Sequence, residues 1–347
     1  MTVRNGGAST PGEFPLVSAR AERQLNLDPT QSSPGIEPDT RDIADRLAIL
    51  FAGRYLILRL IGIGGMASVY LARHRRHQGL FAIKVLHPPL AEDDELLGRF
   101  RREGLIGARL AGHPHIAPVL DVGEGDGLHY LIMPYIPGED LDHLLARLGR
   151  FSFDDALLAV IQINEALLYA CSQEILHCDL TPGNIRLNTF GQFVLFDFGL
   201  ASVSPSWRDC NRPYSFSTRA GTPLYTSPER ILDQQVDIRS DLYSLGAIFY
   251  ELVTGEAAFR GSTPEEIESN HLSPARSLSH PLLAPYPRLL SLLRSLLARF
   301  PEQRCADPVA LKQALRGLTA YPPCLSVQPE ITPEQEIQQP RRRLSHI

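Results

Sequence analysis

The chain has 347 residues, of which 44% are hydrophobic and 21% charged, so it can bury the core of one two-lobed domain or of two small ones. A formal net charge of -5 does not favour a nucleic-acid binder, and no uncharged apolar run reaches the roughly 18 residues that a membrane span needs. Five scattered cysteines, none in a C-x-x-C pair, indicate neither a disulfide framework nor a zinc site, so we expect a soluble cytoplasmic protein without a signal peptide.

Residues 1–50 are predicted to form a disordered leader with a short helix near its end. Up to about residue 40 the sequence is rich in Pro, Gly, Ser and Thr, and has too few apolar side chains to offset the entropy of ordering. Ile43, Leu47, Leu50 and Phe51 then recur at helical spacing, which predicts a helix over 41–51 that leads into the domain.

A glycine-rich loop follows the first predicted strand, Tyr55 to Ile61. Gly62, Gly64 and Gly65 precede a second strand that contains Val69, and such glycines let backbone amides approach phosphate oxygens. An ordinary hairpin is the commoner explanation of this pattern on its own. The strand after the loop, in place of a helix, argues against a dinucleotide-binding fingerprint.

A lysine lies inside the next apolar strand, Phe81 to Leu86. Lys84 needs a counter-charge there, because a buried unpaired ammonium is costly. Glu103, in the amphipathic helix predicted over 96–110, is the best candidate. The alternative is that Glu103 lies on a solvated face beside its arginine neighbours.

Two acidic groups flank a short apolar hairpin between Ile175 and Gly199. Asp179 is followed five residues later by Asn184, and Asp197 lies in a Phe-Asp-Phe-Gly turn. Asp179 suits a base that orients a substrate hydroxyl, while Asn184 and Asp197 offer oxygen ligands to Mg²⁺ on nucleotide phosphates.

Together these motifs resemble the protein kinase signature. The matching stretches are the glycine loop, Phe81-Ala82-Ile83-Lys84, His177-Cys178-Asp179-Leu180-Thr181-Pro182-Gly183-Asn184, Asp197-Phe198-Gly199 and Ser227-Pro228-Glu229. They occur in the kinase order over about residues 53–318, and look most like bacterial eukaryotic-like serine/threonine kinases. Ala67, Cys178 and Thr181 stand where the family has glycine, arginine and lysine.

The resemblance implies an α+β fold with two lobes. An N-lobe over 51–136 would hold a small antiparallel sheet and one main helix, and a mostly helical C-lobe would span 137–320. Residues 321–347, in which Pro, Gln and Glu dominate, are expected to form a flexible tail.

The resemblance also assigns roles to individual residues. Lys84, Glu103, Asp179 and Thr181 fall at catalytic positions, and Asn184 and Asp197 at metal positions. Asp241 would brace the catalytic-loop backbone, and Glu229 would pair with Arg304 as a structural bridge. The ATP-binding positions are Gly62, Gly64, Gly65, Val69, Ala82, Lys84, Met133, Pro134, Ile136, Asp140 and Arg186.

Five of these nucleotide positions carry specific expectations. Met133 would be the gatekeeper, while the Pro134 carbonyl and the Ile136 amide would bond the adenine edge. Asp140 would lie near the ribose or a basic substrate residue, with a helix-starting acid as the alternative. Arg186 replaces an apolar floor beneath adenine, where its stem or its planar guanidinium would stack.

An activation segment is expected between Asp197 and Glu229, with Ser215, Ser217 and Thr218 as candidate phosphosites. Cys178 stands where phosphorylation-switched kinases carry the arginine that receives the phosphate. A thiol cannot make that bidentate, charge-assisted contact. Phosphorylation at Ser215, Ser217 or Thr218 should therefore order the activation segment poorly.

The function implied is a serine/threonine protein kinase that uses ATP and Mg²⁺ and acts on protein substrates, with neither nucleic acid nor membrane as a partner. Thr181 would slow it, because losing one preorganised donor costs about 3 kcal/mol. A pseudokinase scaffold is the alternative, motivated by Thr181, Ala67 and Arg186. A small-molecule phosphotransferase is disfavoured by the activation segment. The sequence assigns no oligomeric state.

Overall fold

A computed structural model describes residues 40–203, 223–273, 278–319 and 323–330. Its small lobe is built on a five-stranded antiparallel sheet in the order β1-β2-β3-β5-β4. The strands are β1 (Tyr55–Ile63), β2 (Ala67–His74), β3 (Leu80–Leu86), β4 (Asp121–Gly125) and β5 (Leu128–Pro134). Side chains alternate across a sheet, so in β3 Ile83 and Val85 face one side and Lys84 faces the other.

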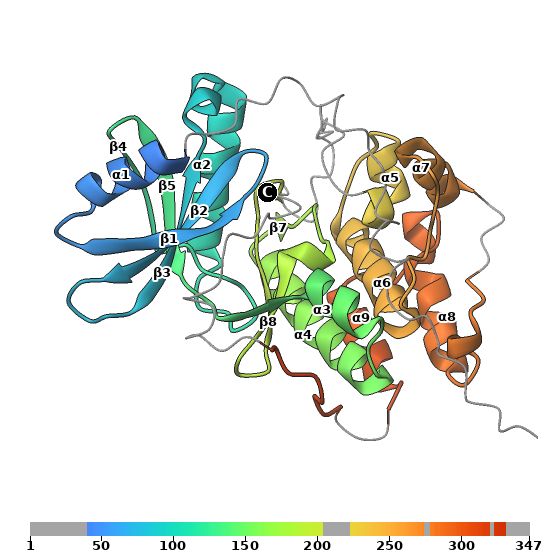
Figure 1. Ribbon diagram of the computed structural model, residues 1–347. Coiled ribbons are helices and arrows are strands. Elements are labelled where there is room, and N and C mark those ends of the chain that lie inside the picture. Colours follow the sequence, from blue (N-terminus) through green and yellow to red (C-terminus); the bar gives the residue numbers. More distant parts are fainter. Residues whose placement is uncertain (1–39, 204–222, 274–277, 320–322, 331–347) are drawn as a thin grey trace, which may run out of the picture. The chain divides into compact units, whose positions relative to one another are not determined.

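A helix covers each face of this sheet (Figure 1). α1 (Thr40–Leu50) packs Ile43 and Leu47 against Tyr70, Ile83 and other residues of one face. The short helix predicted at 41–51 therefore packs into the core of the small lobe, so this lobe includes residues ahead of the predicted boundary at residue 51. Residues 1–39, predicted as disordered, lie outside the described residues.

α2 (Asp94–Arg109) covers the other face and carries Glu103. Asp93 caps it by accepting hydrogen bonds from the amides of Glu95 and Leu96. The helix lies close to the sheet because Gly104 has no side chain: a Cβ there would lie 2.6 Å from a methyl group of Leu131. This close approach brings Glu103 within reach of β3.

The large lobe is mostly helical and holds the largest hydrophobic core. Its helices are α3 (Leu141–Leu148), α4 (Phe153–Ser172), α5 (Pro228–Ile231), α6 (Ile238–Thr254), α7 (Pro264–Leu272), α8 (Pro287–Leu296) and α9 (Pro308–Arg316). It also contains short strands: β6 (Gly138–Asp140), β8 (Ile185–Asn188) and β9 (Phe193–Leu195) form one sheet, and β7 (Ile175–Leu176) pairs with β10 (Ser202–Val203). Short 3₁₀ turns connect the elements: η2 (Pro88–Glu92), η3 (Pro182–Asn184), η4 (Pro223–Tyr225), η5 (Pro281–Leu283) and η6 (Pro301–Gln303). This architecture confirms the predicted two-lobed α+β fold.

α4 is the central helix of the large lobe. By length and composition it is also the one helix among the described residues that could cross a membrane, although 61% of its most apolar window is buried within the protein. Burial to this extent is typical of a core helix. Ser152 caps the first turn of α4 by accepting a hydrogen bond from the amide of Asp155.

Residues 323–330 lie against the large lobe, which differs from the flexible tail predicted from residue 321. Leu325 and Val327 are half-buried against its core, and the Ser326 amide donates to Asp155 at 2.6 Å. Residues 331–347 are outside the described residues.

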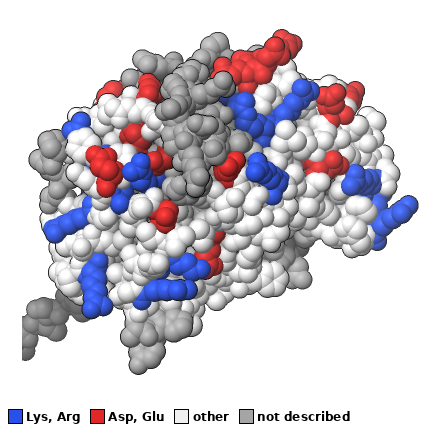
Figure 2. Space-filling model, turned by 180° about the vertical axis from the view of Figure 1, so that it is seen from behind, with Lys and Arg blue, Asp and Glu red and all other residues white. Residues whose placement is uncertain are grey.

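The surface charges are mixed. On the face shown in Figure 2, basic and acidic side chains lie interspersed among the coloured residues and form no continuous basic field. This agrees with the small net charge of -5.

Candidate active site

Lys84 of β3 lies between two carboxylates. Its Nζ donates to Glu103 Oε1 and Oε2 at 2.8 and 2.9 Å, and lies 3.5 Å from Asp197 Oδ1. The side chains of Lys84 and Glu103 are each 8% exposed, and that of Asp197 is 18% exposed. The structure therefore joins the sheet, α2 and the loop after β9 through a single ammonium group.

The charges of this group are unevenly balanced. Burial lowers the pKa of Lys84, but the negative charges of Asp197 and Glu103 outweigh burial and raise it. Burial raises the pKa of Glu103 to about 7, where Lys84 opposes the shift and Asp197 adds to it. Two carboxylates share one cation, so the site holds an excess of negative charge that a bound cation would neutralise.

Asp197 reaches this position through an unusual backbone. Its φ of 58° lies in the left-handed region, and its Oδ1 accepts from the amide of Gly199 at 3.0 Å. Phe198 is buried and packs on the His177 ring with centroids 4.7 Å apart. The buried Phe198 anchors the turn that presents the Asp197 carboxylate.

Asp241 of α6 fixes the backbone before Asp179. Its two carboxylate oxygens accept from the amides of His177 and Cys178, each at 2.8 Å. Burial raises the pKa of Asp241, and these contacts oppose the shift. Cys178 has a φ of 63°, a conformation that the two anchored amides hold in place. The structure thus places Asp241 in the bracing position that the sequence predicted.

Asp179 and Asn184 are joined within the catalytic loop. The Asn184 Nδ2 donates to the Asp179 carbonyl at 2.8 Å, so the amide oxygen is the side-chain atom that could bind a metal. The Asp179 amide contacts His177 Nδ1 at 3.2 Å. Asn184 and Asp197 supply the oxygen atoms that a hard cation such as Mg²⁺ prefers.

Thr181 carries a buried polar atom without a hydrogen-bond partner among the described residues. The residue is 2% exposed, and its Oγ1 is buried and unsatisfied. A buried hydroxyl without a partner costs free energy, and a ligand that accepts a hydrogen bond from it would remove that cost. Together with the oxygen donors nearby, it shows that the residues fit a phosphate-bearing ligand and a divalent cation.

The glycine loop connects β1 and β2. Gly62 pairs with Val69 across the hairpin, and the Gly64 amide donates to the Ala67 carbonyl at 2.9 Å.

A buried histidine, which the sequence interpretation missed, braces this glycine loop. His87 Nε2 lies 3.0 Å from Ser68 Oγ, and its amide donates to the Met66 carbonyl at 2.9 Å.

The residues assigned to the base pocket lie along β3, β5 and the segment after β5. Ala82 pairs with Met133 in the sheet, and both pack in a cluster with Val69. Pro134 ends β5, and Ile136 follows two residues later. The structure therefore brings Val69, Ala82 and Met133 together, next to the segment that holds Pro134 and Ile136.

Arg186 and Asp140 form a contact that the sequence did not predict. Nε and Nη2 of Arg186 donate to the two carboxylate oxygens of Asp140 at 2.7 and 3.0 Å, and Nη1 donates to the Ile136 carbonyl at 3.2 Å. Asp140 precedes α3, yet its side chain makes no capping bond. Each residue thus neutralises the other, and Asp140 acts neither as a helix cap nor as a lone acid.

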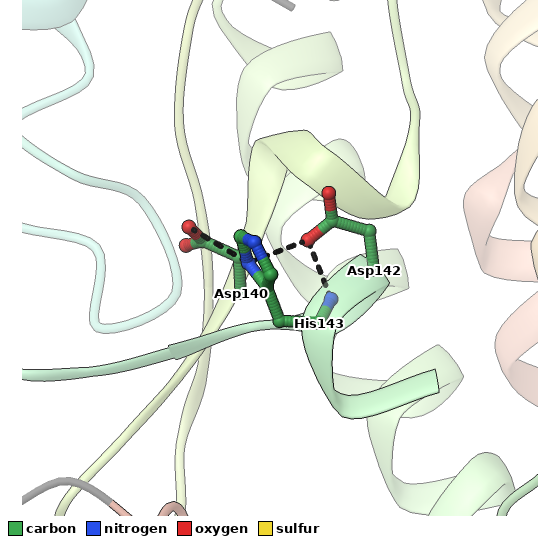
Figure 3. Close-up of side chains that lie close together, drawn as sticks. All are labelled: Asp140, Asp142 and His143. Carbon is green, nitrogen blue, oxygen red and sulfur yellow. Dashed lines mark hydrogen bonds and ion pairs between the residues drawn. The ribbon is translucent and has the colours of Figure 1, made fainter. Parts of the chain in front are cut away.

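Asp140, Asp142 and His143 lie close together beside this pair (Figure 3). His143 Nδ1 is 3.2 Å from Asp142 Oδ1 and 3.8 Å from Asp140 Oδ2. These atom types suit a metal ion. However, Arg186 already supplies a positive charge to both oxygens of Asp140, so the group is explained without a metal.

A second buried ion pair lies deep in the large lobe. Arg304 donates to both oxygens of Glu229 at 2.7 Å, and the side chains are 0% and 3% exposed. Burial would raise the pKa of Glu229, but the bonds from Arg304 and Ser240 prevail and lower it. This bridge has the position and the partners that the sequence assigned to a structural pair.

The candidate phosphosites Ser215, Ser217 and Thr218 lie outside the described residues, as does Cys210. Cys178 is 3% exposed and packs with Cys171, Leu176 and Ile238. The thiol therefore belongs to a small apolar cluster beside the catalytic loop.

A lysine pinned between two carboxylates, an acid-braced loop with Asp179 and Asn184, and a two-lobed fold define the class of ATP-dependent phosphotransferases. The family model of the protein kinase domain matches residues 55–316. The chain therefore belongs to the protein kinase family.

Its relatives include bacterial kinases. It is 34% identical over 280 residues to the probable serine/threonine-protein kinase pknA2 of Bifidobacterium longum, covering 80% of this chain and 36% of the relative. It is 36% identical over 221 residues to the serine/threonine-protein kinase PrkC of Bacillus subtilis, covering 64% and 33%. With the serine/threonine-protein kinase PknA of Mycobacterium tuberculosis it shares 34% over 285 residues, covering 79% and 64%. The chain thus spans about a third to two thirds of the length of these curated relatives.

Proposed function

We propose that this chain is an active serine/threonine protein kinase that transfers the γ-phosphoryl group of ATP to Ser or Thr hydroxyls of proteins. The observation that carries the proposal is the contact of Lys84 with both Glu103 and Asp197. This contact links the sheet, α2 and the metal-binding loop in the arrangement that phosphoryl transfer needs. The names of the bacterial relatives support the serine/threonine class.

Each residue has a defined task in this mechanism. Lys84 orients the nucleotide phosphates, and the Asp179 carboxylate accepts the proton of the substrate hydroxyl as its oxygen approaches the γ-phosphorus. Asn184 and Asp197 would hold Mg²⁺, which when bound offsets the negative charge of the phosphates. The protein contributes mostly positioning and electrostatics, because phosphoryl transfer needs little covalent assistance.

The pseudokinase alternative rests on Thr181, Ala67 and Arg186, and the geometry weakens it. Arg186 is held by Asp140 and by the Ile136 carbonyl, so its guanidinium is neutralised. Asp179, Asn184 and Asp197 are all retained and all anchored. Thr181 is then expected to limit the rate without abolishing it.

The test is incubation of the purified protein with Mg-ATP and a mixed Ser/Thr peptide library, followed by mass spectrometry of the incorporated phosphate. Asp197→Ala is the matched control, and binding of a fluorescent ATP analogue is measured in parallel. We expect phosphate on Ser and Thr with the wild type alone. Equal background transfer by both proteins, with the nucleotide still bound, would support the scaffold instead.

A further inference from the structure

The segment Pro323–Glu330, here called the strap, lies on the large lobe in an extended form. Leu325 and Val327 are half-buried against the core, whereas Cys324, Ser326 and Gln328 between and beside them are exposed. This alternation is typical of an extended chain with one face down. Figure 1 draws the strap in red beside β8 and α3.

One carboxylate holds the centre of the strap. Asp155, in the first turn of α4, accepts from the Ser326 amide at 2.6 Å and from the Val327 amide at 3.4 Å through Oδ1. Its Oδ2 accepts from the hydroxyls of Ser326 and Ser152, each at 2.6 Å. The strap is therefore bound by donors that converge on one buried negative charge.

A second anchor lies at the end of the strap. Arg147 at the C-terminus of α3 contacts Glu330 at 3.2 Å and donates to the Gln328 carbonyl at 3.3 Å. The same guanidinium donates to Glu139 at 2.8 Å, one residue before Asp140. The positive charge of Arg147 therefore attracts an acidic residue at the end of the strap, whereas the negative charge of Asp155 repels one at the centre.

We propose that Ser326 is a phosphorylation site and that a phosphate there releases the strap. Ser326 is exposed and carries the only hydroxyl side chain among residues 323–330. The inference rests on the proposed kinase function. It takes the donor to be a second copy of this chain, so the transfer is between molecules.

The chemistry follows from the contacts. The Ser326 oxygen forms a bond to the γ-phosphorus of ATP as the bond to the β-γ bridging oxygen breaks, ADP leaves, and the hydroxyl proton passes to Asp179 of the donor molecule. The hydroxyl donor to Asp155 is thereby replaced by a group with a charge of about −1.5 to −2 that only accepts hydrogen bonds. That group faces a carboxylate at contact distance, so repulsion replaces attraction.

The first experiment measures hydrogen exchange of the Ser326 and Val327 amides. Ser326→Asp should speed their exchange at least tenfold, whereas Ser326→Ala keeps both backbone donors and should change it little. Gln328→Asp is the matched control, because it adds the same charge to the next outward residue, near Arg147. If Ser326→Asp and Gln328→Asp behave alike, the proposed release is refuted.

The double variant Ser326→Asp with Asp155→Asn tests the cause. An asparagine still accepts the two amides but carries no charge, so exchange should return toward the wild-type rate. Continued fast exchange in the double variant, with Asp155→Asn alone unchanged, would mean that repulsion by Asp155 is not the reason, and would overturn the mechanism.

The second experiment tests the modification. Wild-type protein and Mg-ATP are mixed with the Asp197→Ala protein as acceptor, and phosphate on the acceptor is mapped. Phosphate on Ser326 together with faster exchange of the strap supports the inference. Phosphate on other residues alone, or on Ser326 with a protected strap, overturns it and leaves the kinase function intact. No phosphate anywhere refutes both.

Discussion

Two buried ion pairs of this protein, Lys84 with Glu103 and Arg304 with Glu229, show opposite electrostatic outcomes. Both join segments distant in the sequence, and both are almost inaccessible to solvent. Yet burial raises the pKa of Glu103, whereas bonds from Arg304 lower the pKa of Glu229 against burial. The difference lies in the balance of partners.

Glu229 receives two guanidinium donors and a bond from the Ser240 hydroxyl, so its charge is fully compensated. Glu103 shares a single ammonium with Asp197, so the two carboxylates repel one another. The first arrangement stabilises a fold. The second leaves an incompletely neutralised site, as a protein that binds a cation and phosphates requires.

The largest expected effect concerns the compensated pair. Arg304→Met leaves Glu229 buried without a partner and should lower the free energy of unfolding by about 3–5 kcal/mol. Denaturant unfolding measures it. Arg239→Met is the control, because its pair with Asp237 is 31% and 43% exposed and should contribute less than about 1 kcal/mol. A loss in Arg304→Met as small as in the control would remove the contrast.

Lys84→Met tests the uncompensated pair. We expect phosphate transfer to fall by about 100-fold to 1000-fold, because a preorganised donor to the phosphates is lost. The stability loss should stay below that of Arg304→Met, because Glu103, with a pKa of about 7, can take up a proton when its partner is removed. Initial rates and denaturant unfolding test the two parts. An equal stability loss in both variants would contradict the comparison.

Thr181→Lys adds a cation to the uncompensated site. Thr181 places a short hydroxyl where the family has a long cation, so a lysine at this position should raise kcat by up to about a hundredfold. Thr181→Val, which removes the hydroxyl and adds no cation, is the control and should not raise kcat. A kcat that stays level or falls in Thr181→Lys would show that another group already supplies the charge.

The smallest expected effect is a pH dependence. Because the folded pKa of Glu103 is about 7, above the ordinary value of 4.5, the folded protein holds a proton in this window that the unfolded chain has released. The contribution of Glu103 to the free energy of unfolding therefore falls as the pH rises from 4.5 to about 7. Over the same range Glu103 loses its proton and becomes the carboxylate that orients Lys84. Activity should fall about tenfold per pH unit below 7.

Rates measured across this window check the prediction, with Glu103→Gln as the control whose residual activity should lack the acid limb. Glu229 has the opposite sign: its lowered pKa contributes stability above the ordinary glutamate pKa, and this is lost as the pH falls through the folded value. The same acid limb in Glu103→Gln would assign the titration to another group.

The resemblance to the kinase family named the partners of both pairs, because each matching motif lies in an element whose place in that fold is fixed. They did not give the contact of Asp140 with Arg186, since that depends on the register of β6 against β8, which places the two residues opposite each other. His87 was missed because a lone histidine carries no pattern. The strap was missed because its attachment uses backbone amides that meet Asp155, and composition does not report such contacts.

The position of α1 determines which fragments of this protein can be handled in solution. The family model begins at residue 55, after α1 has ended. A fragment cut there would strip Ile43 and Leu47 from the sheet and expose Tyr70 and Ile83, which are otherwise 1% and 0% accessible. An apolar sheet face of that kind invites self-association, so recombinant versions should begin before Thr40.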